Sequence, residues 1–388
     1  MGGFECSTHL RRPGGERLDL MQATRHDELA MQDYAALRGF GILAVRDGIR
    51  WHRIETTPGH YDFTADLPMA RAACQTGTQV IWDLCHYGWP DDLDPFLPQF
   101  GHRLAAMARA FVRLLLEEGE ARPFVVPINE ISFLAWSGGD EGLLPPFARH
   151  RGHELKRCLV RAAIETIDAV REVAPQTRIC LIDPMINVAG RFNDPENCLA
   201  AEEYRQAQYT AWDMMAGMAD PELGGKPGYL DVVGLNYYAD NQWLHARGGE
   251  FVRRLLPGDF GYRPVWDMLS EVYARYGRPL FIAETGAEGH HRAAWLRSIC
   301  EQVYLAMARG VPIESICLYP ILDYPGWADD RHCRTGLFGY ADRNGRRPLC
   351  WSLGAELLRQ QAMLTRTLVV SAQEDARAEQ TEIVTGQP

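Results

Sequence analysis

Eight short runs of apolar and β-branched residues alternate along the chain with longer segments of helical periodicity, and this order predicts an α/β fold, a single (β/α)8 or TIM barrel. Eight repeated units favour closure of the parallel sheet into a barrel. An open doubly wound sheet usually carries a G-x-G-x-x-G loop after its first strand. Here the first run leads into STHLRRPGGERL, which lacks that motif, so the open sheet is the weaker alternative.

The predicted strands are short and apolar, as the strands of a buried parallel sheet are. In chain order they cover Gly3–Thr8, Ile42–Arg46, Gln79–Leu84, Phe124–Ile128, Arg178–Ile182, Asp231–Asn236, Leu280–Ala283 and Ser315–Tyr319.

Between the strands, apolar residues recur three and four positions apart, which is the spacing of one buried helix face. The predicted helices cover His26–Arg38, Ala65–Gln75, Gly101–Glu118, Glu154–Val173, Ala201–Met218, Val265–Tyr276, Ala293–Arg309 and Leu353–Gln360. Because no linker-like segment interrupts this series, we expect one barrel domain over residues 1–370. Residues 371–388 are polar and acidic, and we expect them to form a loosely ordered tail.

The 388 residues carry 40 basic and 51 acidic side chains, a formal net charge of −11, and 46% of them are hydrophobic. A nucleic-acid-binding protein needs a basic face, and a surface-anchored protein needs a basic amphipathic helix; the sequence supplies neither. No apolar run approaches the ~20 residues that a membrane span requires. We therefore expect neither nucleic acid nor a membrane as a partner.

Ten scattered cysteines, none in a C-x-x-C pair, favour reduced thiols over a metal or disulfide framework. The N-terminus lacks the pattern of a signal peptide, and a reducing cytoplasmic location fits both observations. The only two lysines, Lys156 and Lys226, do not follow predicted strands, which disfavours Schiff-base chemistry. His290 and His291 lack the carboxylate–histidine spacing of a metal site. We expect no metal and no organic cofactor.

In a (β/α)8 barrel the chemistry lies on the loops that follow the carboxyl ends of the strands, so polar residues at these ends mark the candidate site. Such residues follow most of the predicted strands: His9, Arg46, His86, Asn129, Glu130, Tyr238, Glu284 and Trp327.

Two of these residues are carboxylates, Glu130 after FVVPIN and Glu284 after PLFIA. The fourth and seventh strands face each other across a barrel mouth, so both acids can contact one substrate. A carboxylate pair about 5–5.5 Å apart suits retaining glycoside hydrolysis, in which one attacks the anomeric carbon and the other serves as acid and then base. Arg46 and Tyr238 are placed to keep the nucleophile ionised, whereas the acid needs a raised pKa. The alternative is that each glutamate only caps a helix.

Six sequence blocks resemble, in the correct order, those of the family 1 glycoside hydrolases, the β-glucosidase-like members of the retaining (β/α)8 clan. The blocks are RDGIRWHRIETTPGHYDF, LCHYGWP, PINEISF, GLNYY, IAETG and the closing LYPILDYPGWADDRHCRTGLFGYAD. The similarity runs from Phe4 to about Gly354.

The resemblance implies a role for each matching residue. Glu284 would be the nucleophile and Glu130 the acid/base, with Tyr238 touching the nucleophile. Arg46 matches the arginine of the second-strand block. Asn129 would bind the sugar 2-hydroxyl, and His86 and Trp327 would hold the glycone.

The sequence departs from the family at four positions. Ile131 replaces the proline after Asn-Glu, which matters little chemically. The family's early glutamine is replaced by His9, its late glutamate falls on Gly326, and the tryptophan opening the last block falls on Tyr319. These changes imply an altered glycone-binding set, with a glycone other than simple glucose bound in the usual way. A modified, charged or differently linked sugar is the alternative that they leave open.

The expected substrate is therefore a small or oligosaccharide β-glycoside. Transglycosylation to an acceptor alcohol by the same residues is one alternative, and a catalytically silent sugar-binding barrel is another. A metal-dependent barrel hydrolase would need His-x-His after the first strand, which is absent. The sequence leaves the glycone, the linkage and the oligomeric state open, a homo-oligomer included.

Overall fold

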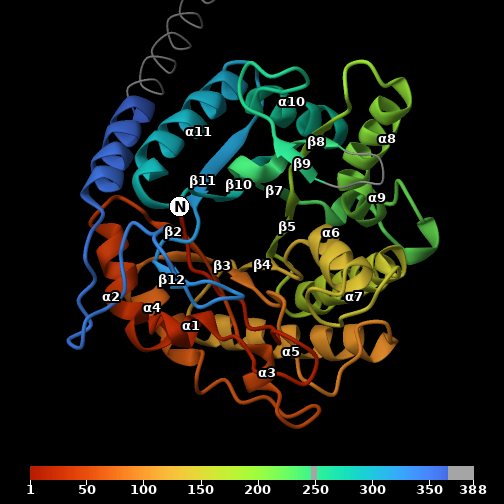
Figure 1. The fold of residues 1–388 in the computed structure, drawn as a ribbon. Coiled ribbons are helices and arrows are strands. Elements are labelled where there is room, and N and C mark those ends of the chain that lie inside the picture. Colours follow the sequence, from red (N-terminus) through yellow and green to blue (C-terminus); the bar gives the residue numbers. More distant parts are fainter. Residues whose placement is uncertain (246–250, 366–388) are drawn as a thin grey trace, which may run out of the picture.

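The computed structural model describes residues 1–245 and 251–365. Its centre is a closed barrel of eight strands in the order β1-β11-β10-β7-β5-β4-β3-β2, and each neighbouring pair is parallel (Figure 1). The strands are β1 (Gly2–Gly3), β2 (Ala44–Gly48), β3 (Gln79–Asp83), β4 (Phe124–Val126), β5 (Arg178–Pro184), β7 (Val232–Asn236), β10 (Leu280–Thr285) and β11 (Ile313–Leu318). Each overlaps a predicted strand, so the single (β/α)8 barrel is confirmed.

Helices surround the barrel on its outer side (Figure 1). They are α1 (Leu20–Ala23), α2 (His26–Arg38), α3 (Trp51–Ile54), α4 (Leu67–Thr76), α5 (Pro98–Glu117), α6 (Ile131–Leu134), α7 (Gly152–Val173), α8 (Pro195–Gln206), α9 (Thr210–Ala216), α10 (Val265–Tyr276) and α11 (Arg292–Met307). Residues 351–365 are also helical. The predicted domain boundary at residue 370 and the tail 371–388 lie outside the described residues. None of the described helices is both long and apolar enough to cross a bilayer.

The helix predicted over Ala201–Met218 is wrong in one respect, because the structure divides it into α8, a 3₁₀ turn at Ala207–Tyr209 and α9. The side-chain amide of Gln208 donates to the carbonyl oxygen of Arg205 at 2.7 Å. A side chain that takes up a backbone carbonyl in this way competes with the regular helical hydrogen bonds. Periodicity alone does not reveal such a competitor.

Strand β1 is much shorter than the predicted Gly3–Thr8. The backbone N–H of Ser7 donates to Glu5 Oε1 at 3.0 Å instead of joining the ladder. A local side-chain acceptor therefore ends the strand. The N–H of Phe4 still donates to the carbonyl oxygen of Arg46 on β2 at 2.9 Å, and no regular strand follows it.

A cluster of apolar side chains from the barrel strands fills the barrel interior: Ile81, Val126, Cys180, Ile182, Val232, Phe281 and Ala283. Gly234 is required in β7, because a Cβ there would lie 2.6 Å from Ile182 Cγ1 and 2.8 Å from Phe281 Cε1. A larger apolar cluster fills the space between the barrel and the helices. The barrel is therefore a packed core, and substrate access is confined to its ends.

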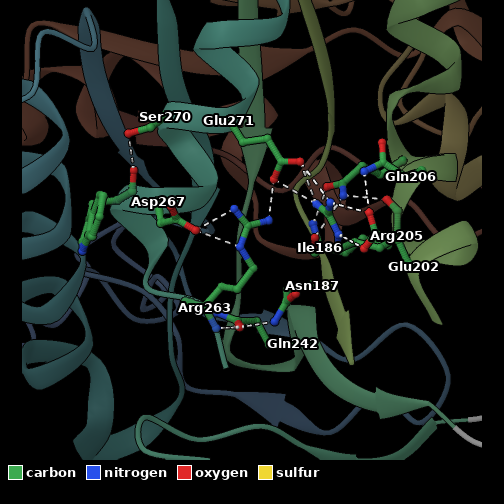
Figure 2. Close-up of polar contacts among 12 residues, drawn as sticks. Ile186, Asn187, Glu202, Arg205, Gln206, Gln242, Arg263, Asp267, Ser270 and Glu271 are labelled. Carbon is green, nitrogen blue, oxygen red and sulfur yellow. Dashed lines mark hydrogen bonds and ion pairs between the residues drawn. The ribbon is translucent and has the colours of Figure 1, made fainter. Parts of the chain in front are cut away.

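Two small sheets that the sequence did not predict lie outside the barrel. One contains β6 (Asn187–Ala189), β8 (Gln242–His245) and β9 (Phe251–Arg254), and the other contains β12 (Tyr324–Pro325) and β13 (His332–Cys333). Figure 2 shows a polar network that joins the first of these sheets to α8 and α10. Arg205 on α8 and Arg263 just before α10 both pair with Glu271 on α10.

Candidate active site

The acidic residue at the end of β10, Glu284, is held through both carboxylate oxygens. Arg46 Nη1 donates to Oε1 at 2.6 Å, and the Tyr238 hydroxyl donates to Oε2 at 2.9 Å. Glu284 is only 6% exposed. A guanidinium and a phenol as partners fix the direction of both carboxylate oxygens.

Arg46, which is fully buried on β2, links this carboxylate to the neighbouring strands. Its Nη2 lies 2.8 Å from Asp83 Oδ2 and donates to Asn129 Oδ1 at 2.6 Å. Although burial lowers the pKa of Arg46, the nearby Asp83 and Glu284 raise it well above its ordinary value. The guanidinium also lies over the ring of Tyr319, 5.3 Å from the ring centroid. Arg46 thus stays charged and orients three side chains from three strands.

Glu130 lies where the chain passes from β4 to α6, with φ 45° and ψ 63°. The left-handed region is uncommon for a residue with a side chain, and such conformations concentrate at functional sites. Asn236 Nδ2 donates to Glu130 Oε1 at 2.8 Å, and the Tyr87 hydroxyl donates to Oε2. The backbone therefore aims this carboxyl at donors from β7 and from the loop after β3.

Burial and then the negative charge of Glu284 raise the pKa of Glu130 to about 8. Asn236, which donates to Glu130, is also the register partner of Glu284 on the adjacent strand. The two predicted acids therefore meet at one end of the barrel, in unlike environments. One is paired with a cation, whereas the other is buried and favours its protonated form near neutral pH.

His86 and Asn129 lie beside these two acids. His86 Nδ1 is 2.9 Å from Asp83 Oδ2, and Asn129 Nδ2 is 3.2 Å from His86 Nε2. Although burial lowers the pKa of His86, its hydrogen bond to Asp83 contributes to a net rise. Asn129 Nδ2 also donates to the Tyr87 hydroxyl at 2.9 Å.

Cys6, Asp83 and His86 place ligand-type atoms within 4.8 Å of one another. The Asp83 carboxylate in this group is already bound by Arg46 and His86. A cation would have to compete with the buried guanidinium for the same oxygens, so we assign no metal to this cluster.

The side chains of His9 and Trp327 lie next to each other in the site. Their ring centroids are 4.9 Å apart in an edge-to-face arrangement, and Tyr87 packs edge-on against Trp327 at 5.7 Å. Burial, helped by nearby cations, lowers the pKa of His9 to about 3, so its ring is neutral. Among the described residues, His9 Nδ1 has no hydrogen-bond partner.

The structure thus brings together every candidate residue that the sequence predicted. It adds side chains to which sequence reasoning assigned no role: Glu5, Asp83, Tyr87 and Asn236, of which Asn236 was recognised only as a polar residue at a strand end. Tyr87 and Asn236 were within reach, because they lie in the blocks LCHYGWP and GLNYY. The left-handed backbone of Tyr87, with φ 64°, had no local signal, since neither glycine nor asparagine stands there.

A cavity of about 460 Å³ lies next to this site, and Tyr87 and Trp89 are among the residues that line it. It is also lined by Arg17, Phe147 and Arg151, from the loops after β1 and β4. Apolar rings and guanidinium groups both face it. Space for a part of a ligand beyond the carboxylate pair therefore exists on this side.

No protein-family model and no curated protein sequence matches the chain. Solved structures do match it. A β-glucosidase from Thermotoga maritima in complex with glucoimidazole aligns over 88% of this chain and 87% of its own, with 18% identity and a TM-score of 0.73. The AHE enzyme from Alicyclobacillus herbarius aligns over 88% of both chains, with 18% identity and a TM-score of 0.75. At this identity the likeness shows the fold, and the chain shares the (β/α)8 barrel of family 1 β-glucosidase structures.

Proposed function

We propose that the protein is a retaining glycoside hydrolase that cleaves a β-linked glycoside, with Glu284 as nucleophile and Glu130 as acid/base. The observation that carries the proposal is the contrast between the two acids. Glu284 is held by Arg46 and Tyr238, while burial and the charge of Glu284 raise the pKa of Glu130 to about 8. One ionised and one protonated carboxyl at a single site is the requirement of double displacement.

In the first step, a Glu284 oxygen attacks the anomeric carbon while Glu130 gives its proton to the glycosidic oxygen. The bond to the leaving group breaks, the aglycone departs as an alcohol, and a glycosyl ester forms on Glu284. In the second step, the Glu130 carboxylate takes a proton from water, whose oxygen attacks the anomeric carbon and releases Glu284. Two inversions leave the β-configuration unchanged.

The neighbouring side chains support these steps by orientation. The Tyr238 and Arg46 hydrogen bonds fix the attacking carboxylate, which lowers the cost of reaching the reactive geometry. In this proposal Asn129 and His86 bind glycone hydroxyls, and the ring of Trp327 packs against the sugar. The solved structures with this fold include β-glucosidases in complex with glucoimidazole and with deoxynojirimycin, which agrees with a sugar-sized ligand.

The test is the variant Glu284→Gly assayed with an aryl β-glycoside that has an activated leaving group. We expect hydrolysis to fall by roughly 10⁴-fold or more, because the covalent step is lost. Added azide should restore turnover by entering the vacated space, and the product should be the inverted α-glycosyl azide. Turnover that persists in the variant without azide, or an azide product of retained configuration, would rule out Glu284 as nucleophile.

A further inference from the structure

A third glutamate, Glu5, lies at the same end of the barrel and has no part in the proposed two-step chemistry. Its side chain is only 6% exposed. Oε1 accepts hydrogen bonds from Ser7, at 3.0 Å from the backbone N–H and 2.5 Å from the hydroxyl. Within residues 1–245 and 251–365, no hydrogen bond reaches the second oxygen, Oε2. Oε2 is not among the fully buried unpaired atoms of the described residues, so this oxygen retains access to solvent and is free to meet a ligand.

The surroundings of Glu5 are those of the predicted glycone subsite. His86 Nε2 is 3.9 Å from Glu5 Oε1. The charges of Glu5 and Glu284 interact. Burial is the main cause of the raised pKa of Tyr319, and the charges of Glu5 and Glu284 raise it further. The Tyr319 ring is parallel to that of His86, with centroids 6.2 Å apart. Glu5 therefore lies near both the nucleophile and the histidine that is expected to hold the sugar.

Two further polar atoms in this part of the site are without partners. Tyr319 Oη and His9 Nδ1 are buried and make no hydrogen bond within the described ranges. Leaving a buried polar group unpaired is unfavourable in the free protein. A ligand with several hydroxyl groups would supply donors and acceptors to this set.

The charge of the site limits what that ligand can carry. Glu5, Asp83 and Glu284 are acidic, and the guanidinium of Arg46 is already bonded to Asp83, Asn129 and Glu284. Burial, partly offset by His86 and the Ser7 hydrogen bond, raises the pKa of Glu5, and the charge of Glu284 adds to this rise. An anionic glycone would raise that pKa further, so its binding would cost either like-charge repulsion or the uptake of a proton. A carboxylate or phosphate on the glycone would meet the open oxygen of Glu5 with no cation committed to it. Like charges at short range in a buried site are strongly unfavourable.

From these observations we infer that Glu5 is a specificity-determining residue of the proposed glycosidase, whose Oε2 accepts a hydrogen bond from a hydroxyl of a neutral glycone and whose charge excludes anionic glycones. This inference rests on the proposed function.

The competing explanation is structural, since Glu5 also binds Ser7. The variant Glu5→Gln separates the two. Its carbonyl oxygen can still accept from Ser7, whereas the open oxygen becomes an amide donor without charge. Glu16→Gln is the matched control, because Glu16 is exposed on the following loop and its side chain makes no hydrogen bond in the described part of the chain.

The experiment measures kcat and KM for wild type and both variants with three kinds of aryl β-glycoside. These are the neutral hexoside that wild type cleaves best, its monodeoxy analogues, and the corresponding uronide. For Glu5→Gln we expect kcat/KM on the hexoside to fall about 10- to 100-fold, the range for a hydrogen bond to a charged group. The loss should vanish for one deoxy analogue, and the preference for hexoside over uronide should shrink at least tenfold.

Equal losses on all deoxy analogues, or an unchanged preference against the uronide, would overturn the assignment of Glu5. If Glu5→Gln does not fold, the wild-type enzyme still tests the inference, because cleavage of the uronide as fast as the hexoside would contradict it. Failure of the proposed function is distinguishable, since wild type would then cleave none of these substrates. The control Glu16→Gln should match wild type throughout.

Discussion

Two arginine-centred networks of charge occur in this molecule, one at the barrel mouth around Arg46 and one between α8 and α10 around Arg205 and Arg263. In both, a guanidinium binds several acceptors from different elements. They differ in what surrounds them. None of the labelled residues in Figure 2 has a buried polar side-chain atom without a partner in the described chain. Around Arg46, such atoms occur on His9, Asn236 and Tyr319.

The backbone conformations of the two networks also differ. Arg205 and Glu271 lie in regular helices, whereas Glu130 and Tyr87 have φ values of 45° and 64°. The network between α8 and α10 is complete in the free protein and serves to hold the outer sheet against the barrel. The network at the mouth contains strain and unused hydrogen-bonding capacity, which is what a site completed by its substrate should contain.

After Glu284→Gly, the largest expected effect comes from removing the second acid, Glu130. We expect Glu130→Ala to lower kcat/KM by roughly 10²–10⁴-fold for substrates with poor leaving groups, because these need the proton. Substrates with good leaving groups should lose far less. A series of aryl glycosides with graded leaving-group pKa measures this, and equal losses across the series would contradict the acid/base role.

The pH dependence follows from the same residue. Glu130 must be protonated to act as acid, and burial together with the charge of Glu284 raises its pKa to about 8. The kcat/KM of the wild-type enzyme should therefore be maintained through neutral pH and decline as the pH rises through about 8. A profile of kcat/KM against pH measures this, and an alkaline limb near pH 5 would show that Glu130 is not the acid.

A substitution in the network between α8 and α10 should change the stability of the protein and leave its activity unchanged. Arg205→Met leaves Glu271 with one cationic partner fewer, and we expect the free energy of unfolding to fall by about 2 kcal/mol. Because Glu271 keeps Arg263 and is partly exposed, the effect should stay below that of a fully buried pair. Urea unfolding measures it. A changed kcat/KM at equal folding would break the distinction between the two regions.

The smallest effect compares two tyrosines. Tyr276 donates its hydroxyl to Asp213 at 2.9 Å, whereas the buried hydroxyl of Tyr319 has no partner in the described residues. We expect Tyr276→Phe to destabilise the protein and Tyr319→Phe to stabilise it, each by about 1 kcal/mol. Tyr319→Phe should at the same time lower kcat/KM. Thermal unfolding of both variants measures these changes in stability. Destabilisation by Tyr319→Phe would indicate that the Tyr319 hydroxyl has a hydrogen-bond partner in the wild-type protein.

Much of this protein was readable from its sequence, because the relevant patterns are local. Apolar runs and helical periodicity predicted all eight barrel strands, and α2 and α10 match their predicted bounds. Since chemistry in this architecture follows strand ends, the polar residues after those runs marked the site, and the structure places Arg46 against Glu284 across 238 positions of sequence.

Other features required the closed barrel. The bond from Tyr87 to Glu130, the left-handed backbone at both, and the open oxygen of Glu5 depend on side chains that distant strands bring together. The small outer sheets rest on strands of two to four residues, too short for a periodic signal. The sequence by itself therefore determined the barrel and marked Glu130 and Glu284 as candidate acids at strand ends, because burial imprints a repeating pattern on neighbouring residues. Only the tertiary structure decided how those acids differ, because burial depth, charge and hydrogen-bond partners arise from contacts between residues far apart in the chain.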